Sequence, residues 1–186
     1  MQSSRSRPER HEHFLNRAKV VAEMSTCLRR KVGAIIVSRD GVELSSGYSG
    51  APRGSEHCAE VGKCLRTELK IPSGQNYELC RSVHAEQNAI INAARTGVSI
   101  VGGEMYISSE KMKGAYGNDD EKDKIYGPCI ICKKEIINAG LTAVYMREEG
   151  VGERKYTLPQ IRYMLIQEEA KWREKLGQGI HVIKSA

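Results

Sequence analysis

Apolar positions that recur every three to four residues predict the helices of this chain. From Pro8 to about Met24 they follow that spacing, which indicates an amphipathic helix. His11 and His13 are two apart on this helix, so they face different ways and are expected to be exposed rather than to bind metal. Residues 82–94 are apolar on almost every side, which predicts a buried helix with Ser82 as its N-cap.

Two more helices are expected in the second half of the chain. Pro128 is expected to open one that runs to about Asn138, with Gly140 as its stop. The last helix is expected from apolar positions that share one face, and these are Leu158, Ile161, Leu165, Trp172 and Leu176.

Short segments between these helices predict strands, and the first of them is a β-branched run. One covers residues 31–38, and the hairpin signal Asp40-Gly41 leads into a second at 42–48. Residues 103–108 and 141–146 are expected to form two more. This order of helices and strands indicates an α/β sandwich with a mixed sheet, in which the first pair of strands is antiparallel and the later crossover parallel.

Two segments do not fit this pattern. Residues 49–80 are rich in Gly, Pro and charge and are too long for a routine connection, so the segment is expected to be functional or held in place. Residues 110–127 form a charged, glycine-containing insertion that is expected at the surface, with Asp119 and Asp120 solvated.

The length of 186 residues suits one compact domain, which we expect at 9–178 between a disordered lead-in at 1–8 and a tail at 179–186. The apolar stretches are far too short to span a membrane. The net charge of +6 says little by itself about an anionic partner. Six cysteines without a visible secretory signal are expected to be reduced thiols or metal ligands in a cytoplasmic protein.

Two short motifs carry the candidate chemistry: HAE at 84–86 and PCIIC at 128–132, each at a predicted helix start. His84, Cys129 and Cys132 offer three ligands and leave a fourth position open, which is typical of catalytic zinc. Glu86 is suited to take a proton from an activated water and to deliver it to the substrate. The pattern H-x-E…P-C-x-x-C is the signature of zinc nucleobase deaminases. The alternative, a core histidine and an accidental cysteine pair, needs both motifs to arise by coincidence.

These motifs, with CLRRKVGAIIV at 27–37, GYSGAPRG at 47–54 and HAEQNAI at 84–90, resemble the deoxycytidylate (dCMP) deaminase branch of the cytidine deaminase-like superfamily. The resemblance implies a three-layer α/β/α sandwich with a mixed central sheet of about five strands. It implies hydrolysis of dCMP to dUMP and ammonia, which supplies dUMP for thymidylate synthesis. Zinc would be held by the histidine of HAE and both cysteines of PCIIC, with Glu86 as the proton carrier.

The resemblance also implies substrate contacts. The backbone N–H of Ala85 would hold the pyrimidine carbonyl, and the block 47–54 would contact the nucleotide, with Arg53 pairing with the phosphate. Ser49 stands where the family usually has Asn, and its shorter side chain changes the sugar contacts expected there. The alternative for this block is a tight loop punctuated by Gly and Pro.

Regulation and assembly follow from the same resemblance. Arg95 matches a position where the family can carry a charged residue linked to nucleotide regulation, which makes dCTP and dTTP candidate effectors. The alternative is an ordinary solvated cation at a helix end. Members of the family assemble as dimers or hexamers, so a homo-oligomer is expected.

Four cysteines remain, and some relatives carry a second, structural zinc near their positions. They are Cys27, Cys58, Cys64 and Cys80. Four thiolates would close a tetrahedral site and would hold the segment 49–80 to the core, with His57 as a candidate replacement for one of them. The alternative is that these cysteines are buried apolar side chains, since cysteine is among the residues most often buried and their spacing contains no paired CxxC.

Other functions compete with dCMP deamination. A tRNA adenosine deaminase shares HAE and PCxxC but needs a concentrated basic face, whereas Lys and Arg are dispersed among acids here, so no nucleic-acid partner is expected. Other nucleobase deaminations, including those of guanine and riboflavin precursors, stay open. A non-catalytic, zinc-stabilised nucleotide-binding protein would have no use for Glu86.

Overall fold

A five-stranded mixed sheet in the order β2-β1-β3-β4-β5 forms the centre of the protein. The computed structural model describes residues 7–71, 75–112 and 127–175. β1 pairs antiparallel with β2 and β3, β3 runs parallel to β4, and β4 pairs antiparallel with β5. The strands are β1 (Arg30–Val37), β2 (Glu43–Tyr48), β3 (Glu104–Lys111), β4 (Ala143–Glu148) and β5 (Gly152–Thr157).

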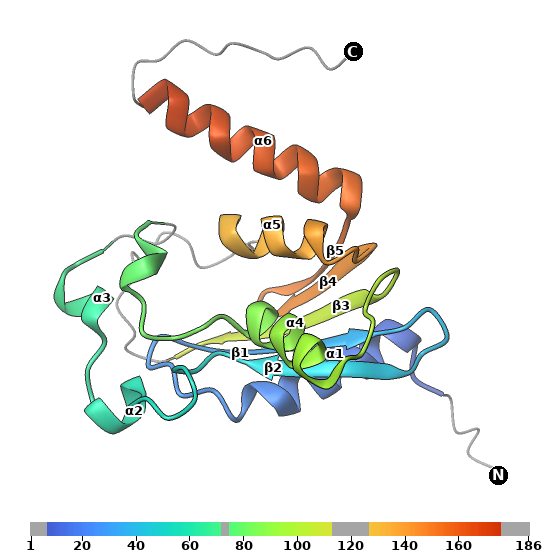
Figure 1. Ribbon diagram of the computed structural model, residues 1–186, viewed down its shortest axis with the longest axis horizontal. Helices are drawn as coiled ribbons and strands as arrows, with labels where there is room; N and C mark the ends of the chain where they lie inside the picture. Colours follow the sequence, from blue (N-terminus) through green and yellow to red (C-terminus); the bar gives the residue numbers. More distant parts are fainter. Residues whose placement is uncertain (1–6, 72–74, 113–126, 176–186) are drawn as a thin grey trace.

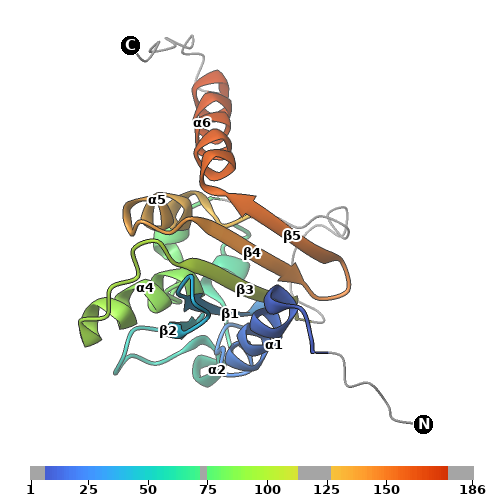
Figure 2. The ribbon, with the colours of Figure 1, turned by 90° about the vertical axis from the view of Figure 1, so that its right-hand side faces the viewer.

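Helices cover both faces of the sheet, as Figure 1 shows. α1 lies on one face, α4 and α5 lie on the other, and α6 packs on α5 and projects away from the sheet (Figure 2). The predicted α/β/α sandwich is thereby confirmed. The helices are α1 (Arg10–Ala22), α2 (Cys58–Val61), α3 (Leu65–Glu68), the 3₁₀ turn η1 (Tyr77–Leu79), α4 (Ala85–Thr96), α5 (Ile130–Asn138) and α6 (Leu158–Lys175).

Alternation along the strands divides the core into two parts. On β1, Ala34 and Ile36 belong to the larger core beneath α4 and α5, whereas Ile35 and Val37 belong to the smaller core beneath α1. All four side chains are fully buried, which explains why this part of β1 is a continuous apolar run, as expected for a central strand.

The edge strand β5 is not among the four strands that the sequence predicts. Its first four residues are exposed, and Tyr156 is the buried one. Backbone pairing with β4 holds the strand, and such pairing leaves no apolar pattern in the sequence. At the other end of the sheet, Glu110 and Lys111 continue β3 rather than starting the surface insertion, since they pair with β1. Most of that insertion, with Asp119 and Asp120, lies outside the described residues.

The two helices that carry the motifs start later than expected. The N-cap of α4 is His84 rather than Ser82, and the N-cap of α5 is Cys129, after Pro128. α4 is also less buried than its apolar sequence suggests: Ala85, Ala89 and Ala93 are buried, but Ala94 is exposed and Ile91 is 47% exposed. Packing on one side of the sheet buries one face of a helix, however apolar the other is.

Only part of the predicted apolar face of α6 is buried. Ile161 is fully buried, Leu158 and Leu165 are half-buried, and Trp172 is 42% exposed. The helix outruns α5, its packing partner, so its later turns leave the core (Figure 2). Leu176 lies outside the described residues. No helix within the described ranges is both long and apolar enough to cross a membrane.

Gly47 allows β2 and α4 to approach closely. A Cβ at this position would lie 2.3 Å from the backbone nitrogen of Ala89 and 2.6 Å from the carbonyl oxygen of Ala85. The first glycine of the block 47–54 therefore serves helix–sheet packing, and it seats the helix that begins with the HAE motif.

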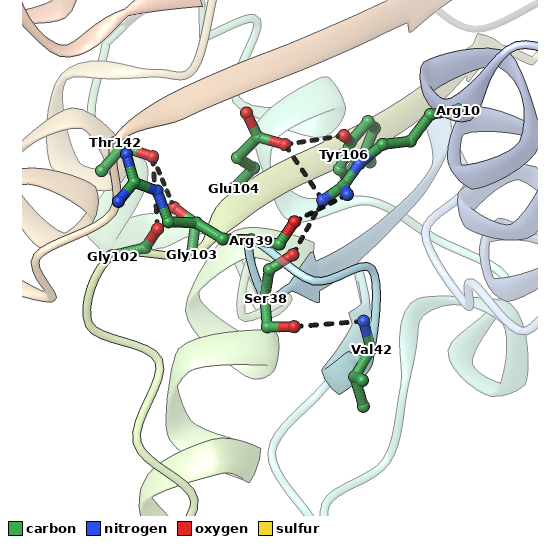
Figure 3. A network of polar contacts seen from close by, with 9 residues as sticks. All are labelled: Arg10, Ser38, Arg39, Val42, Gly102, Gly103, Glu104, Tyr106 and Thr142. Carbon is green, nitrogen blue, oxygen red and sulfur yellow. Dashed lines mark hydrogen bonds and ion pairs between the residues drawn. The ribbon is translucent and has the colours of Figure 1, made fainter.

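A polar network ties the start of α1 to the β1–β2 hairpin (Figure 3). The guanidinium of Arg10 donates to the carbonyl oxygens of Ser38 (2.8 Å) and Arg39 (2.7 Å) and lies 3.6 Å from a carboxylate oxygen of Glu104. The neighbouring His11 is exposed, as is His13, which confirms the predicted exposure of both side chains.

Candidate active site

The side chains of His84, Cys129 and Cys132 meet at one point. Nδ1 of His84 lies 3.3 Å from Sγ of Cys129 and 3.4 Å from Sγ of Cys132. In the described part of the chain, this is the one group of at least three His, Cys, Asp or Glu side chains whose ligand atoms all lie within 4.8 Å of one another. The predicted convergence of the two motifs is confirmed.

Helix starts place all three ligands. His84 is the N-cap of α4 and Cys129 is the N-cap of α5, so both lie where backbone N–H groups point outward. The N–H of Cys132, in the first turn of α5, donates to the sulfur of Cys129 at 3.5 Å. The positive ends of both helices thus face the ligand atoms, which favours thiolate over thiol.

One amide side chain links the two helix starts. Oε1 of Gln87 accepts a hydrogen bond from the backbone N–H of His84 (3.0 Å), and its Nε2 donates to Oε1 of Glu135 on α5 (2.8 Å). The side chain of Gln87 therefore fixes the position of α4 relative to α5 next to the ligands.

One of the three ligand side chains, Cys129, already favours the thiolate that zinc binds. A hydrogen bond from Cys132 lowers the pKa of Cys129 to about 4, and the same pairing raises the pKa of Cys132. Burial lowers the pKa of His84, but its hydrogen bond with Cys129 and the charge of Glu86 raise it above the ordinary value. One thiolate, a second thiol beside it and an imidazole form the nitrogen–sulfur donor set that zinc prefers.

Glu86 lies on the first turn of α4 and is only 6% exposed. Burial raises the pKa of its carboxyl group, whereas the neighbouring His84 lowers it. Glu86 lines the same pocket as the ligands, and a hydrogen bond with Cys132 also lowers its pKa. A buried carboxylate beside a metal site is equipped to exchange protons.

These groups open into a pocket of about 260 Å³. Its walls come from the starts of α4 and α5, from one end of β1 and β3, and from the segment 49–80. Five Lys or Arg side chains line it, and these are Arg29, Arg30, Arg66, Arg81 and Lys111. Lys111 at the end of β3 and Gly127 shortly before α5 both line this pocket.

Two of the three predicted substrate residues lie in the pocket wall, whereas the third and the predicted effector residue lie elsewhere. Ser49 and Ala85 line the pocket, and Oγ of Ser49 is 2.6 Å from Oγ of Ser25. Arg53 does not line it: its guanidinium donates to Oδ1 of Asn92 on α4 (2.8 Å). Arg95 is exposed at the far end of α4, one helix length from the ligands.

The other four cysteines are free thiols, and all of them line the same pocket. Burial raises the pKa of Cys58, and the charges of Cys27, Cys64 and Cys80 raise it further. No three of these four described sulfurs lie within 4.8 Å of one another. His57 does not join them, because it caps α2: its Nδ1 accepts from the N–H of Glu60 (3.1 Å).

Two residues of the pocket belong to no motif that the sequence shows. The ring of Tyr77 lies edge-on to the imidazole of His84, with centroids 5.3 Å apart, and the guanidinium of Arg66 lies 5.0 Å from the centre of the Tyr77 ring. Burial and the charge of Cys129 raise the pKa of Tyr77 to about 12, so its hydroxyl stays protonated. The unexplained length of the segment 49–80 was the one signal for these residues.

Comparisons with known proteins agree with this geometry. A family model described as "cytidine and deoxycytidylate deaminase zinc-binding region" matches residues 8–148. ComE operon protein 2 of Bacillus subtilis is 34% identical over 139 residues, which cover 75% of this chain but 59% of that protein. Deoxycytidylate deaminase of Mycobacterium phage D29 is 30% identical over 149 residues, covering 78% of this chain and 99% of the phage protein.

A solved structure extends the similarity to the fold. The dCMP deaminase of cyanophage S-TIM5, determined in complex with dCMP and dUMP, is 27% identical to this chain with a TM-score of 0.54. The match covers 87% of this chain and 93% of that one. With its ligand group, buried glutamate and matched region, the chain belongs to the cytidine and deoxycytidylate deaminase family, which is defined by its zinc-binding region.

Proposed function

We propose that the protein hydrolyses dCMP to dUMP and ammonia and so supplies dUMP for thymidylate synthesis. The observation that carries the proposal is the buried carboxylate of Glu86, which shares one pocket with a nitrogen–sulfur ligand group. Membership of the family and the dCMP and dUMP bound to the cyanophage relative support the choice of substrate.

The residues of this chain divide the chemistry among them. His84, Cys129 and Cys132 would hold zinc, which supplies an activated water molecule at neutral pH. The carboxylate of Glu86 would take one proton of that water and deliver it to the ring nitrogen of the pyrimidine. It would then carry the second proton, from the hydroxyl added to the ring, to the leaving amine. The backbone of Ala85, which lies between ligand and proton carrier, would hold the pyrimidine carbonyl.

The phosphate of the nucleotide requires cations in the pocket wall. Because Arg53 is engaged with Asn92 and lies off the pocket, we assign this contact to the basic side chains that do line it. Arg30 is already tied to Glu148 by two contacts of 2.9 Å, whereas Lys111 is exposed at the end of β3. A cationic wall of this kind suits a phosphate dianion.

Ammonia release from a panel of substrates tests the proposal. Purified protein is mixed with dCMP, CMP, dCTP, cytidine or a tRNA stem-loop, with Glu86→Gln as the matched variant. We expect turnover of dCMP, a loss of about a hundredfold or more in Glu86→Gln, and equal zinc content in both proteins. Turnover of the stem-loop alone would assign a tRNA deaminase instead. If the protein contains zinc but releases no ammonia from any of these substrates, the proposal is contradicted.

We also propose a second, structural zinc on the four remaining cysteines. Their shared position along one pocket and their mutual influence on the pKa of Cys58 support it. Zinc would draw these sulfurs together and would hold the segment 49–80 against the core. About two zinc ions per chain, reduced to about one in Cys64→Ser, are expected. About one zinc ion per chain in the unmodified protein would mean that these four thiols only pack against the core.

Assembly and regulation are likewise proposals. Apolar side chains are exposed on and after α4, with Ile91 at 47% and Val101 at 77%, and they favour a homo-oligomer built on dimers, up to a hexamer. Light scattering tests the assembly. For dCTP and dTTP as effectors, we expect altered dCMP kinetics in the unmodified protein and a weaker response in Arg95→Glu.

A further inference from the structure

We infer that Tyr77 is the aromatic wall of the substrate pocket, against which the pyrimidine ring packs, and that Arg66 holds the Tyr77 ring in place. This inference rests on the proposed function, since it requires a substrate with a planar ring. Both residues come from the segment 49–80 and belong to neither sequence motif. Tyr77 would thus determine which ring the pocket accepts.

The place of Tyr77 is defined by its contact with a predicted zinc ligand. Its ring meets the imidazole of His84 at an interplanar angle of 79°, with the ring centroids 5.3 Å apart. Tyr77, His84, Ala85 and Glu86 all line one pocket. A ring presented to Glu86 for proton transfer must therefore lie close to the side chain of Tyr77.

Arg66 fixes the ring of Tyr77 through a buried cation–π contact. Its guanidinium carbon lies 5.0 Å from the ring centroid, and the side chain is 7% exposed. Nη2 of Arg66 donates to the carbonyl oxygen of Gln75 at 2.6 Å, two residues before Tyr77. The same guanidinium thus holds both the ring and the backbone that carries it, and a desolvated cation–π pair is stronger than an exposed one.

No other described residue of the pocket can supply an aromatic carbocycle. Among the side chains that line it, Tyr77 has the one phenol ring, and neither phenylalanine nor tryptophan is present. The single Phe, Phe14, lies in the core beneath α1, and the single Trp, Trp172, lies on α6. Deaminases that read a base hold it by stacking against aromatic or apolar side chains, so this role falls to Tyr77.

This placement gives the segment 49–80 a function. A connection of ordinary length would join β2 to α4 directly, because both already lie side by side. The additional chain forms α2, α3 and η1, and it brings Arg66 and Tyr77 to the pocket from outside the sheet.

Steady-state kinetics with dCMP test the inference. Tyr77→Leu keeps an apolar side chain but loses the ring, and we expect KM to rise about five- to a hundredfold with a much smaller change in kcat. Tyr77→Phe keeps the ring and should stay near the unmodified protein. Glu78→Ala, an exposed neighbour on η1, is the control. Zinc content and melting temperature are measured for each variant, which separates a lost contact from misfolding.

A pair of ligands separates the ring contact from every other contact. dUMP carries the pyrimidine ring, whereas deoxyribose 5-phosphate lacks it. Calorimetry should show that Tyr77→Leu weakens dUMP binding by a factor similar to its effect on KM, and leaves deoxyribose 5-phosphate binding unchanged. Arg66→Met should weaken dUMP binding less, and the double variant Arg66→Met/Tyr77→Leu should bind it no worse than Tyr77→Leu alone.

Several results would overturn the inference. An unchanged KM in Tyr77→Leu would remove Tyr77 from the substrate wall, and a loss in Tyr77→Phe equal to that in Tyr77→Leu would assign the role to the hydroxyl. Equal weakening of both ligands would mean a general distortion of the pocket. The proposed function fails separately, in the unmodified protein, if dCMP is bound but never deaminated.

Discussion

At the candidate zinc site, protons and metal compete for the same three side chains. In the metal-free protein, a hydrogen bond from Cys132 already lowers the pKa of Cys129, whereas Cys132 itself has a raised pKa. The pKa of His84 is raised as well, since its partners Cys129 and Glu86 favour the imidazolium against the effect of burial. Zinc must therefore displace the proton of Cys132 at neutral pH and, in more acidic solution, the proton of His84 too.

We predict that zinc affinity falls steeply as the pH is lowered. Each proton that zinc displaces weakens binding by about tenfold per pH unit. The slope is expected to be about one proton above the pKa of His84 and about two below it, and the change should occur above the ordinary value of 6.5 because that pKa is raised. Competition with a chromophoric chelator at a series of pH values measures the slope. A slope that does not change with pH would contradict these protonation states.

At the scale of secondary-structure elements, the site depends on two helices, α4 and α5, whose N-termini lie next to each other. Their ligands can meet only if α4 and α5 keep their relative position, and Gln87 provides a direct link by bonding to both the backbone of His84 and the carboxylate of Glu135. Gly47 contributes from the other side, because it lets α4 seat closely on β2. Outer groups of this kind commonly change metal affinity by about 10–100-fold.

An exchange of two side chains tests this link. In Gln87→Glu the new carboxylate faces that of Glu135, so we expect zinc affinity to fall about tenfold or more. Glu135→Gln alone should have a small effect, because Gln87 can still donate to an amide oxygen. The double variant Gln87→Glu/Glu135→Gln restores a donor–acceptor pair with the roles reversed, and chelator competition should show recovered affinity. If the double variant were as weak as Gln87→Glu, the link would have no part in holding zinc.

For the whole molecule, bound zinc would join parts that are far apart in the sequence. Its ligands come from residues 84 and 129–132, which start two helices on the same face of the sheet. A ligand that binds only the folded protein stabilises it by mass action, about 4 kcal/mol at a thousandfold excess over Kd. The fold and the metal site are therefore expected to unfold together.

Removal of zinc should lower the melting temperature. For a protein of this length, about 4 kcal/mol corresponds to roughly 10 °C. Calorimetry with and without a strong chelator measures the difference, and readdition of zinc should restore the original value. Cys129→Ser tests the assignment to the catalytic ligands: its response to the chelator should shrink. A full response in that variant would place the stabilising metal elsewhere.

The sequence by itself predicted the three side chains that meet at the candidate zinc site, the candidate proton carrier Glu86 and the class of fold. HAE and PCIIC are short motifs, and local rules place both at helix starts, even though the caps lie one or two residues from where they were expected. The β-branched run at 31–38 and the hairpin signal after it likewise predicted β1 and β2, and residues 103–108 and 141–146 were expected as β3 and β4. Each of these features depends on residues that are near one another in the chain.

Tertiary structure alone decided what depends on distant residues. The polar edge strand β5 exists because β4 offers it backbone partners. Arg53 leaves the pocket because Asn92 accepts its hydrogen bond. Tyr77 reaches His84, and Arg66 reaches Tyr77, from a segment without a periodic pattern. Spacing along the chain encodes helix faces and strand faces. It does not encode which side chains a long connection brings to the pocket, because that depends on packing between elements far apart in sequence.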